Sequence, residues 1–218
     1  MAKLHLVIGN RNYSSWSLRP WMALAMAGIP FEETVIPLYQ PQSRKRIVEH
    51  SGAGKVPVLR HGRLAVWDSL AILEYLAELF PEKKLWPEGK AARAAARSAA
   101  SEMHSGFAAL RNACPMNLRR PRKAAPIGEA AKADVARIDA LWRECRRAHG
   151  RKGKFLFGSF GNADAMFAPV VTRFDTYDVR VSGESRAYME AILATPAFRA
   201  WKEAAIDEPW TIPQAEID

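Results

Sequence analysis

The sequence has few of the residues that build covalent or metal-bound frameworks. Among its 218 residues, Cys114 and Cys145 are the two cysteines, and they form no CxxC pair. Two thiols are too few for a disulfide framework or a cysteine zinc site, so we expect no bound metal. A reducing compartment is the simpler interpretation of so little cysteine, and the predicted location is the cytoplasm.

Long apolar runs are also missing. No stretch approaches the roughly 20 continuous apolar residues that span a membrane. The apolar run within residues 1–9 is too short for a signal peptide. We therefore expect no membrane partner.

Acidic residues are in deficit, with 23 Asp and Glu against 32 Lys and Arg and a formal net charge of +9. The basic residues cluster at 119–123 and 143–154, and neither cluster contains the interleaved aromatics that stack on bases. This pattern favours a solvated basic face or the steering of small anions. It argues against specific nucleic-acid binding.

The first 80 residues have the pattern of a compact α/β unit. Strands are expected at 4–8, 31–37, 56–59 and 64–66, with a hairpin turn at 61–63. One helix is expected after Ser17, a serine cap followed by Pro20, and a second helix opens at Asp68. The order is βαβ and then ββα, ending near Phe80.

A change of composition follows. Residues 81–89 form a polar, proline-punctuated connector, and no convincing strand follows it before the C-terminal tail. Helices are expected at 91–114, 129–149, 163–177, 184–193 and 196–205. The sequence therefore predicts an α/β domain at 1–81 and an all-helical domain at 90–218.

Two pairs of residues in the first unit permit a functional and a purely structural reading. Val56-Pro57 is either an edge-strand proline or a cis peptide that exposes the Val56 backbone to a peptide-like ligand. Asp68-Ser69 is either a simple helix cap or a site for an α-amino acid head group. In the second reading Ser69 and the first helical turn bind the carboxylate, and Asp68 binds the ammonium.

The segment Ser14-Ser15-Trp16-Ser17 also has two readings. Serines before a helix usually cap it. In an enzyme, a hydroxyl here would donate a hydrogen bond to a bound thiolate, and the helix N-terminus would add its positive end. Lowering a thiol pKa by about 2 units needs roughly 2.7 kcal/mol, which one charge-assisted hydrogen bond plus a helix end can supply.

Taken together and in this order, these motifs resemble the cytosolic glutathione transferase superfamily over essentially the whole chain. The segment Ser14–Trp21 is similar to the serine-type active sites of the zeta and tau classes, in which the serine lies five residues before an arginine, here Arg19. The resemblance implies a thioredoxin-like N-terminal domain and glutathione as co-substrate. It implies that Ser14 stabilises the thiolate, and that the glutathione contacts include Ser15, Trp16, Gln40, Lys55, Val56, Pro57, Asp68 and Ser69.

Some residues depart from the family pattern. Trp16 stands where zeta proteins commonly carry Cys, which puts maleylacetoacetate isomerase activity in doubt. Tyr13 lies too late for the tyrosine-type classes and is kept as a second candidate donor. Asp164 matches the aspartate of the family's helix-capping segment, although Gly161 replaces the usual Ser or Thr, and we expect it to be structural.

The second substrate is expected between the domains. His104, Phe107 and Arg111 share one face of the predicted 91–114 helix and either pack on a neighbour or line a pocket for a small apolar or acidic electrophile. The resemblance implies a homodimeric, detoxifying transferase. A non-catalytic binding or scaffold protein and a glutathione-dependent isomerase are the alternatives.

Overall fold

A four-stranded mixed sheet forms the first part of the chain. The computed structural model describes residues 3–217, so the outermost residues of both predicted domains lie outside it. The strands are β1 (Leu4–Ile8), β2 (Glu32–Val35), β3 (Val58–His61) and β4 (Leu64–Trp67), in the order β2-β1-β3-β4. Strand β1 pairs in parallel with β2 and antiparallel with β3, and β3 pairs antiparallel with β4.

The central strand β1 is covered on both faces, which explains why its residues other than His5 are apolar and buried. Leu6 and Ile8 of β1 point into the main core together with α1 (Ser15–Met26) and α3 (Ser69–Leu79). Val7, on the opposite face, joins Ile36, Val58 and Ile47 of α2 (Ser43–Val48) in a second, smaller cluster.

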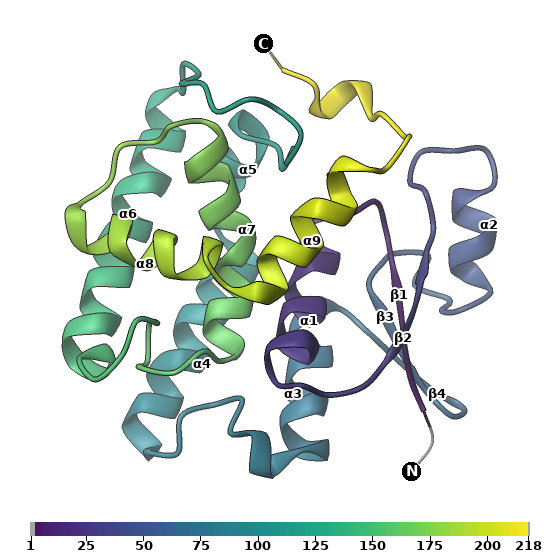
Figure 1. The fold of residues 1–218 in the computed structure, drawn as a ribbon, viewed down its shortest axis with the longest axis horizontal. Coiled ribbons are helices and arrows are strands. Elements are labelled where there is room, and N and C mark those ends of the chain that lie inside the picture. The colour runs from purple at the N-terminus through teal and green to yellow at the C-terminus, as the bar shows by residue number, and fades with distance from the viewer. Residues whose placement is uncertain (1–2, 218) are drawn as a thin grey trace.

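The rest of the chain is helical. Helices α4 (Lys90–Ser105), α5 (Ala108–Ala113) and α6 (Glu129–Cys145) are followed by α7 (Asn162–Thr176), α8 (Gly183–Leu193) and α9 (Pro196–Ile206). Short helical turns lie at Pro81–Lys83, Arg146–Gly150 and Pro213–Ala215. Figure 1 shows these helices on the side of α1 and α3, with α2 beyond the opposite face of the sheet. The predicted order, βαβ and ββα followed by helices, is confirmed.

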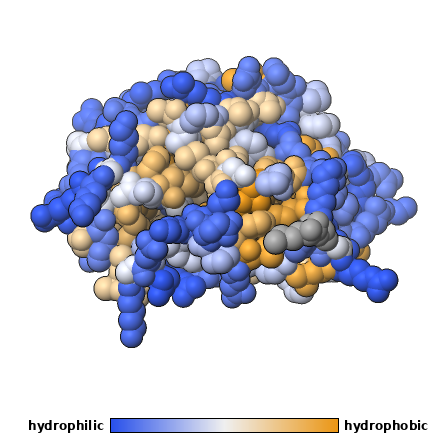
Figure 2. Space-filling view, turned by 60° about the horizontal axis from the view of Figure 1, so that its bottom comes forward, coloured by the Kyte–Doolittle hydropathy of each residue, from blue (hydrophilic) through white to orange (hydrophobic). Residues whose placement is uncertain are grey.

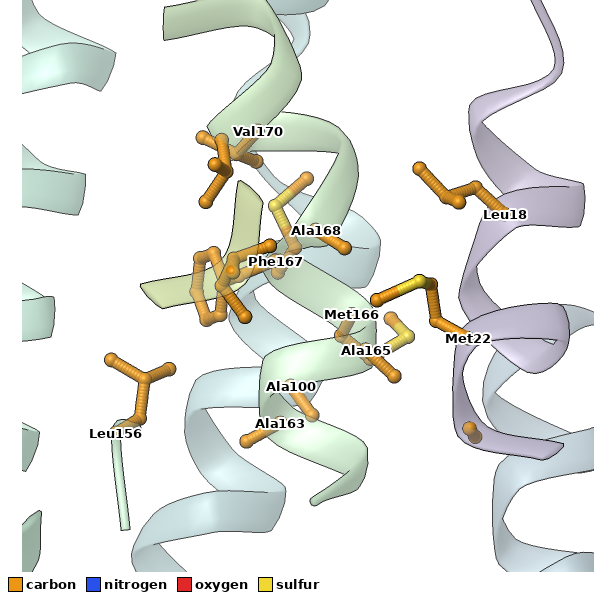
Figure 3. Close-up of a cluster of buried hydrophobic side chains, with 14 of the residues drawn as sticks. Leu18, Met22, Ala100, Leu156, Ala163, Ala165, Met166, Phe167, Ala168 and Val170 are labelled. Carbon is orange, nitrogen blue, oxygen red and sulfur yellow. The ribbon is translucent and has the colours of Figure 1, made fainter. Parts of the chain in front are cut away.

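The main core runs without interruption from the sheet into the helical part. Helix α7 is buried along almost its whole length and packs against both α1 and α4. In Figure 3, Leu18 and Met22 of α1 extend toward Met166 and Ala165 of α7, and Phe167 lies on the other side of that helix. The helix that follows the first strand is therefore fixed by packing against the second half of the chain.

Three sequence-based boundaries were wrong. The helix expected at 91–114 breaks after Ser105, where Gly106 is extended and Phe107 takes a left-handed conformation with φ +59°. The break suits glycine, since a Cβ on Gly106 would lie 2.7 Å from the Glu102 carbonyl oxygen. Helix α1 starts at Ser15, so Ser17 lies inside it. The strand expected at 56–59 begins at Val58, which places Pro57 just before the ladder, where its missing N–H costs no pairing.

The surface carries both apolar and hydrophilic regions (Figure 2). Figure 2 views the side that lies at the bottom of Figure 1 and shows a band of apolar residues bordered by hydrophilic ones. Within residues 3–217, no helix combines the length and the apolar character that a membrane crossing would need.

Asp164 holds the entry to α7, as the sequence predicted. Its carboxylate oxygens accept the backbone N–H of Leu156 at 3.0 Å and of Gly161 at 2.9 Å. Burial raises its pKa from the ordinary 3.8 to about 6, although these hydrogen bonds act in the opposite direction. The folded protein therefore binds this proton more tightly than the unfolded chain does.

Replacing Asp164 with Asn should destabilise the fold by about 1–3 kcal/mol at pH 4, because the amide leaves one buried N–H without an acceptor. The contribution of the wild-type carboxyl to stability is fully present below about pH 4 and is lost as pH rises through about 6. The loss amounts to up to about 3 kcal/mol. Urea unfolding at pH 4 to 7 should therefore show a gap between wild type and variant that narrows as pH rises. A widening gap would contradict the assignment, and the exposed Asp207→Asn serves as the control.

Candidate active site

A cavity of about 580 Å³ lies where the sheet meets the helical part. This volume is in the range of small-molecule sites. Its wall brings together residues from α1, from the segment before β3, from the end of β4 and the start of α3, and from α4. They are Trp16, Ala53, Lys55, Val56, Pro57, Trp67, Asp68, Ser69 and His104.

The segment before β3 supplies one side of the cavity. The Val56-Pro57 peptide bond is cis, whereas the recognition of a peptide-like ligand by the Val56 backbone stays a prediction. Lys55, Val56 and Pro57 all line the cavity, and their predicted contact with glutathione stays a prediction. Gln40 is exposed near the start of α2, where its backbone N–H donates to the Ser43 Oγ at 2.8 Å, and it is not among the lining residues described.

The start of α3 supplies the second side. Asp68 caps this helix, and its Oδ1 accepts the backbone N–H of Leu70 at 2.8 Å and of Ala71 at 3.3 Å. Ser69, the first helical residue, is 1% exposed. A carboxylate acceptor and a hydroxyl at a helix N-terminus thus stand side by side in the cavity wall. The helix cap is observed, and the binding of an amino-acid head group by the same two residues stays a prediction.

Arg19 lies behind this wall. The sequence analysis used Arg19 only to identify the serine five residues before it and gave the arginine no role in the site. Its guanidinium is fully buried, lies 3.9 Å from the centroid of the Trp16 ring and donates from Nη1 to Ser69 Oγ at 3.3 Å. Its Nε and Nη2 find no hydrogen-bond partner within residues 3–217. Burial, followed by repulsion from Arg173 and Arg111, lowers its pKa to about 9.

The helical part reaches the cavity through His104 of α4. Its Nε2 lies 3.1 Å from Asp68 Oδ2, and its ring meets Trp16 edge-on at 5.3 Å between centroids. The Arg111 guanidinium lies 5.8 Å from the Trp16 ring. Phe107 is buried in the main core instead. His104 and Arg111 therefore gather around Trp16 even though their predicted common helix is broken.

The candidate hydrogen-bond donors to a bound thiolate are Ser14, Ser15 and Tyr13. Ser14 and Ser15 are each 5% exposed and are not among the lining residues described. Ser14 Oγ is 2.8 Å from Ser17 Oγ, and Ser17 Oγ accepts the Gly9 N–H at 3.0 Å. The Tyr13 hydroxyl donates to the Glu216 carboxylate and accepts from Arg119 Nη2 at 2.7 Å. Its proton is therefore already used in a hydrogen bond to Glu216. The choice among the three donors stays a prediction.

Comparison with known proteins identifies the family. Residues 13–79 match the family model for the glutathione S-transferase N-terminal domain. The chain is 31% identical to a probable maleylacetoacetate isomerase of Caenorhabditis elegans, over 79% of each protein. The chain belongs to the cytosolic glutathione transferase superfamily. It is also 29% identical to glutathione S-transferase 1 of Dianthus caryophyllus, over 78% of this chain and 76% of that protein.

Solved structures of glutathione transferases share the fold of this superfamily member. A glutathione transferase homolog from Burkholderia gl BGR1 with bound glutathione superposes with a TM-score of 0.72 at 24% identity, covering 94% of this chain and all of that one. The tau-class enzyme of mango, Mangifera indica, gives a TM-score of 0.70 at 20% identity, covering 94% of this chain and 96% of that one. A thioredoxin-like part followed by a helical part is therefore the fold of this chain.

Replacing Arg19 with Met should leave stability unchanged or raise it. Removing a buried, under-paired charge in favour of an apolar side chain of similar length is often neutral or stabilising. The lost contacts with Trp16 and Ser69 are together of the order of 1–3 kcal/mol. Thermal unfolding measures the balance. A melting temperature clearly below that of the wild type would show that those contacts outweigh the burial cost. The control is Arg97→Met, which removes a solvent-exposed arginine that pairs with Glu74.

Proposed function

We propose that this protein is a glutathione transferase: it binds glutathione in the cavity and activates its thiol for attack on a small electrophile. The observation that carries the proposal is the meeting of two peptide-recognition features in one cavity. The cis Val56-Pro57 segment suits an extended peptide, and the Asp68-Ser69 pair suits an amino-acid head group. Glutathione is a peptide with such a head group at its γ-glutamyl end.

In this proposal the start of α3 holds the γ-glutamyl end of glutathione. Ser69 and the positive end of the helix bind its carboxylate, and Asp68 accepts from its ammonium. Arg19 donates to Ser69 Oγ, which leaves the Ser69 proton free to be donated to the ligand. Lys55 and the Val56 backbone then bind the remainder of the tripeptide.

Ser14 is the proposed hydrogen-bond donor to the glutathione thiolate. Ser17 Oγ accepts the Gly9 N–H, so the hydroxyl proton of Ser17 is available for Ser14 Oγ, and the Ser14 proton remains free for a sulfur atom. A free thiol with pKa about 8.5 is only about 3% ionised at pH 7. A hydrogen bond from Ser14 and the N-terminus of α1 together supply the roughly 2.7 kcal/mol needed to lower that pKa by about 2 units.

The second substrate would contact Trp16, where His104 and Arg111 approach from the helical part. The indole ring offers an apolar surface, and the cationic and imidazole groups beside it favour an electrophile that also carries an acidic group. We therefore propose a small, partly apolar electrophile with a carboxylate or similar anion.

A glutathione-dependent isomerase is the second candidate, and the identity to the Caenorhabditis elegans protein favours it. An isomerase returns glutathione unchanged, whereas a transferase consumes it. Measuring free thiol during turnover of an acidic, unsaturated substrate separates the two. Constant thiol with product formation would replace the transferase proposal with the isomerase one.

Replacing Ser14 with Ala should return the thiol pKa of bound glutathione toward that of the free thiol, because the thiolate loses its hydrogen bond. Ultraviolet difference titration of the thiolate measures this pKa without a second substrate. The wild type should show a value about 2 units below 8.5. The exposed Ser105→Ala is the control, since its hydroxyl bonds the Ser101 carbonyl.

Three outcomes separate the roles. An unchanged pKa in the Ser14 variant would transfer the role to Ser15 or Tyr13, whose Ala and Phe variants would be titrated next. Glutathione binding with an unshifted thiol pKa in the wild type would favour the scaffold alternative. Absence of glutathione binding would remove the proposal altogether.

We further propose a cytoplasmic homodimer, on family membership. Strand β4 lies at the edge of the sheet and carries the exposed apolar side chains of Leu64 and Trp67. Light scattering should give twice the 24.3 kDa mass of the chain. A monomer at micromolar concentration would contradict the dimer and leave the chemistry untouched.

A further inference from the structure

The turn that presents Ser14 is held from the far end of the chain. We define the active-site turn as residues 10–14, between β1 and α1, and the C-terminal segment as residues 207–217. Within the turn, the carbonyl oxygen of Asn10 accepts the N–H groups of Tyr13 at 3.2 Å and of Ser14 at 2.7 Å. The N–H groups of Arg11 and Asn12 point the other way, toward the C-terminal segment.

Glu208 meets these two N–H groups. Its Oε1 accepts from the Arg11 N–H at 2.8 Å, and its Oε2 accepts from the Asn12 N–H at 3.2 Å. The Glu208 side chain is buried, and the Arg11 guanidinium lies 3.8 Å from Oε1. A single carboxylate therefore fixes two consecutive peptide units of the turn by charge-assisted hydrogen bonds, which are shorter and stronger than neutral ones.

Further contacts from the helical part secure the same turn. The Trp201 indole N–H donates to the Arg11 carbonyl oxygen at 3.0 Å. The Asn12 side chain donates to Asn117 Oδ1 at 3.0 Å and accepts the Arg119 N–H at 2.9 Å. Arg11 and Asn12 therefore have partners from three separate places in the second half of the chain.

Arg119 connects the C-terminal segment back to the turn. Its Nη1 donates to the Glu208 carbonyl oxygen and its Nη2 to the Trp210 carbonyl oxygen, both at 2.7 Å. The same Nη2 donates to the Tyr13 hydroxyl, which donates to Glu216. The segment is thereby held against the turn at both of its ends.

We propose that Glu208 is a positioning residue of the thiol-activating site: through the Arg11 and Asn12 backbone it sets the place of Ser14 relative to the sulfur of glutathione. The inference rests on the proposed function and deepens it. Glu208 acts through the backbone of the turn and not by contact with a substrate. Its effect is on geometry, and a misplacement of about 1 Å in a catalytic group can lower a rate about 100-fold.

If Glu208 has this role, its loss should affect thiol activation and glutathione affinity differently. The residues proposed to hold glutathione, Val56, Asp68 and Ser69, lie on other elements. Among residues 3–217 they form no hydrogen bond or ion pair with the C-terminal segment. Loosening the turn should therefore weaken thiol activation and spare glutathione affinity. A residue that only stabilised the fold would not produce this separation.

The test compares full-length Glu208→Gln with the wild type by thiolate titration, glutathione affinity and kcat with a model aromatic halide electrophile. In the Glu208→Gln side chain an NH₂ group replaces one carboxylate oxygen and faces a backbone N–H. The turn therefore loses one of the two hydrogen bonds that Glu208 accepts from it. We expect the bound-thiol pKa to rise by about 1 unit and kcat to fall about 10-fold, with glutathione affinity unchanged within about 3-fold. Glu203→Gln, an exposed glutamate on α9, is the matched control.

A second variant guards against misfolding. Glu216 is exposed, so Glu216→Gln should fold, and weakening its bonds to Tyr13 and Asn117 should shift the thiol pKa in the same direction by a smaller amount. Thiol pKa and kcat equal to those of the wild type in both variants would overturn the positioning role alone. A wild-type thiol that titrates like free glutathione would overturn the proposed function, and this role with it.

Discussion

The packing of α1 against α7 is the contact on which the rest of the structure depends. Leu18 and Met22 meet Met166 and Ala165 in the centre of an apolar cluster that extends from the sheet into the helices. The same α1 begins beside Ser14 and carries Trp16, Ser17 and Arg19 on its first turns. Because interiors are densely packed, a helix fixed by such a contact cannot rotate without disturbing the core. The core therefore determines where the polar residues of the site lie.

The candidate site consists of charged and polar groups gathered at the N-termini of two helices. Helices α1 and α3 both begin beside the cavity, and each brings the positive end of its dipole. Arg19 joins them, since it stacks on Trp16 of α1 and donates to Ser69 of α3. His104 of α4 connects the helical part to this arrangement by its contact with Asp68. The Arg19 guanidinium is buried, and two of its donor atoms have no partner among residues 3–217. Such a cation costs stability, and it makes the cavity wall favourable to an anion.

What could be predicted from the sequence was local. The Asp68 cap, the Asp164 cap and the connector after Phe80 depend on residues within a few positions, and these were found. The break at Gly106 was missed because alanine-rich propensity favours a continuous helix, and the left-handed Phe107 that redirects the chain has no marker in the sequence.

The long-range parts of the candidate site were not visible in the sequence. Arg19 lies on α1, which α7, α3 and α9 all pack against, and a pattern of residues cannot show which surface of a helix will be covered. Glu208 contacts the turn across 196 residues, beyond the reach of any spacing rule. Tyr13 remained a candidate donor in the sequence, and its hydroxyl turns out to be engaged by Glu216 and Arg119.

The hold of the C-terminal segment on the turn also sets an order of events during synthesis. A ribosome adds about 5–20 residues per second, so roughly 10 to 40 s separate the appearance of Arg11 from that of Trp201, which lies 190 residues later. The first strand and helix can form while the partners of their connecting turn do not yet exist. A nascent chain halted before Glu208 would carry Ser14 on a turn with two unpaired backbone N–H groups. The turn can therefore be completed only after Glu208 has been made.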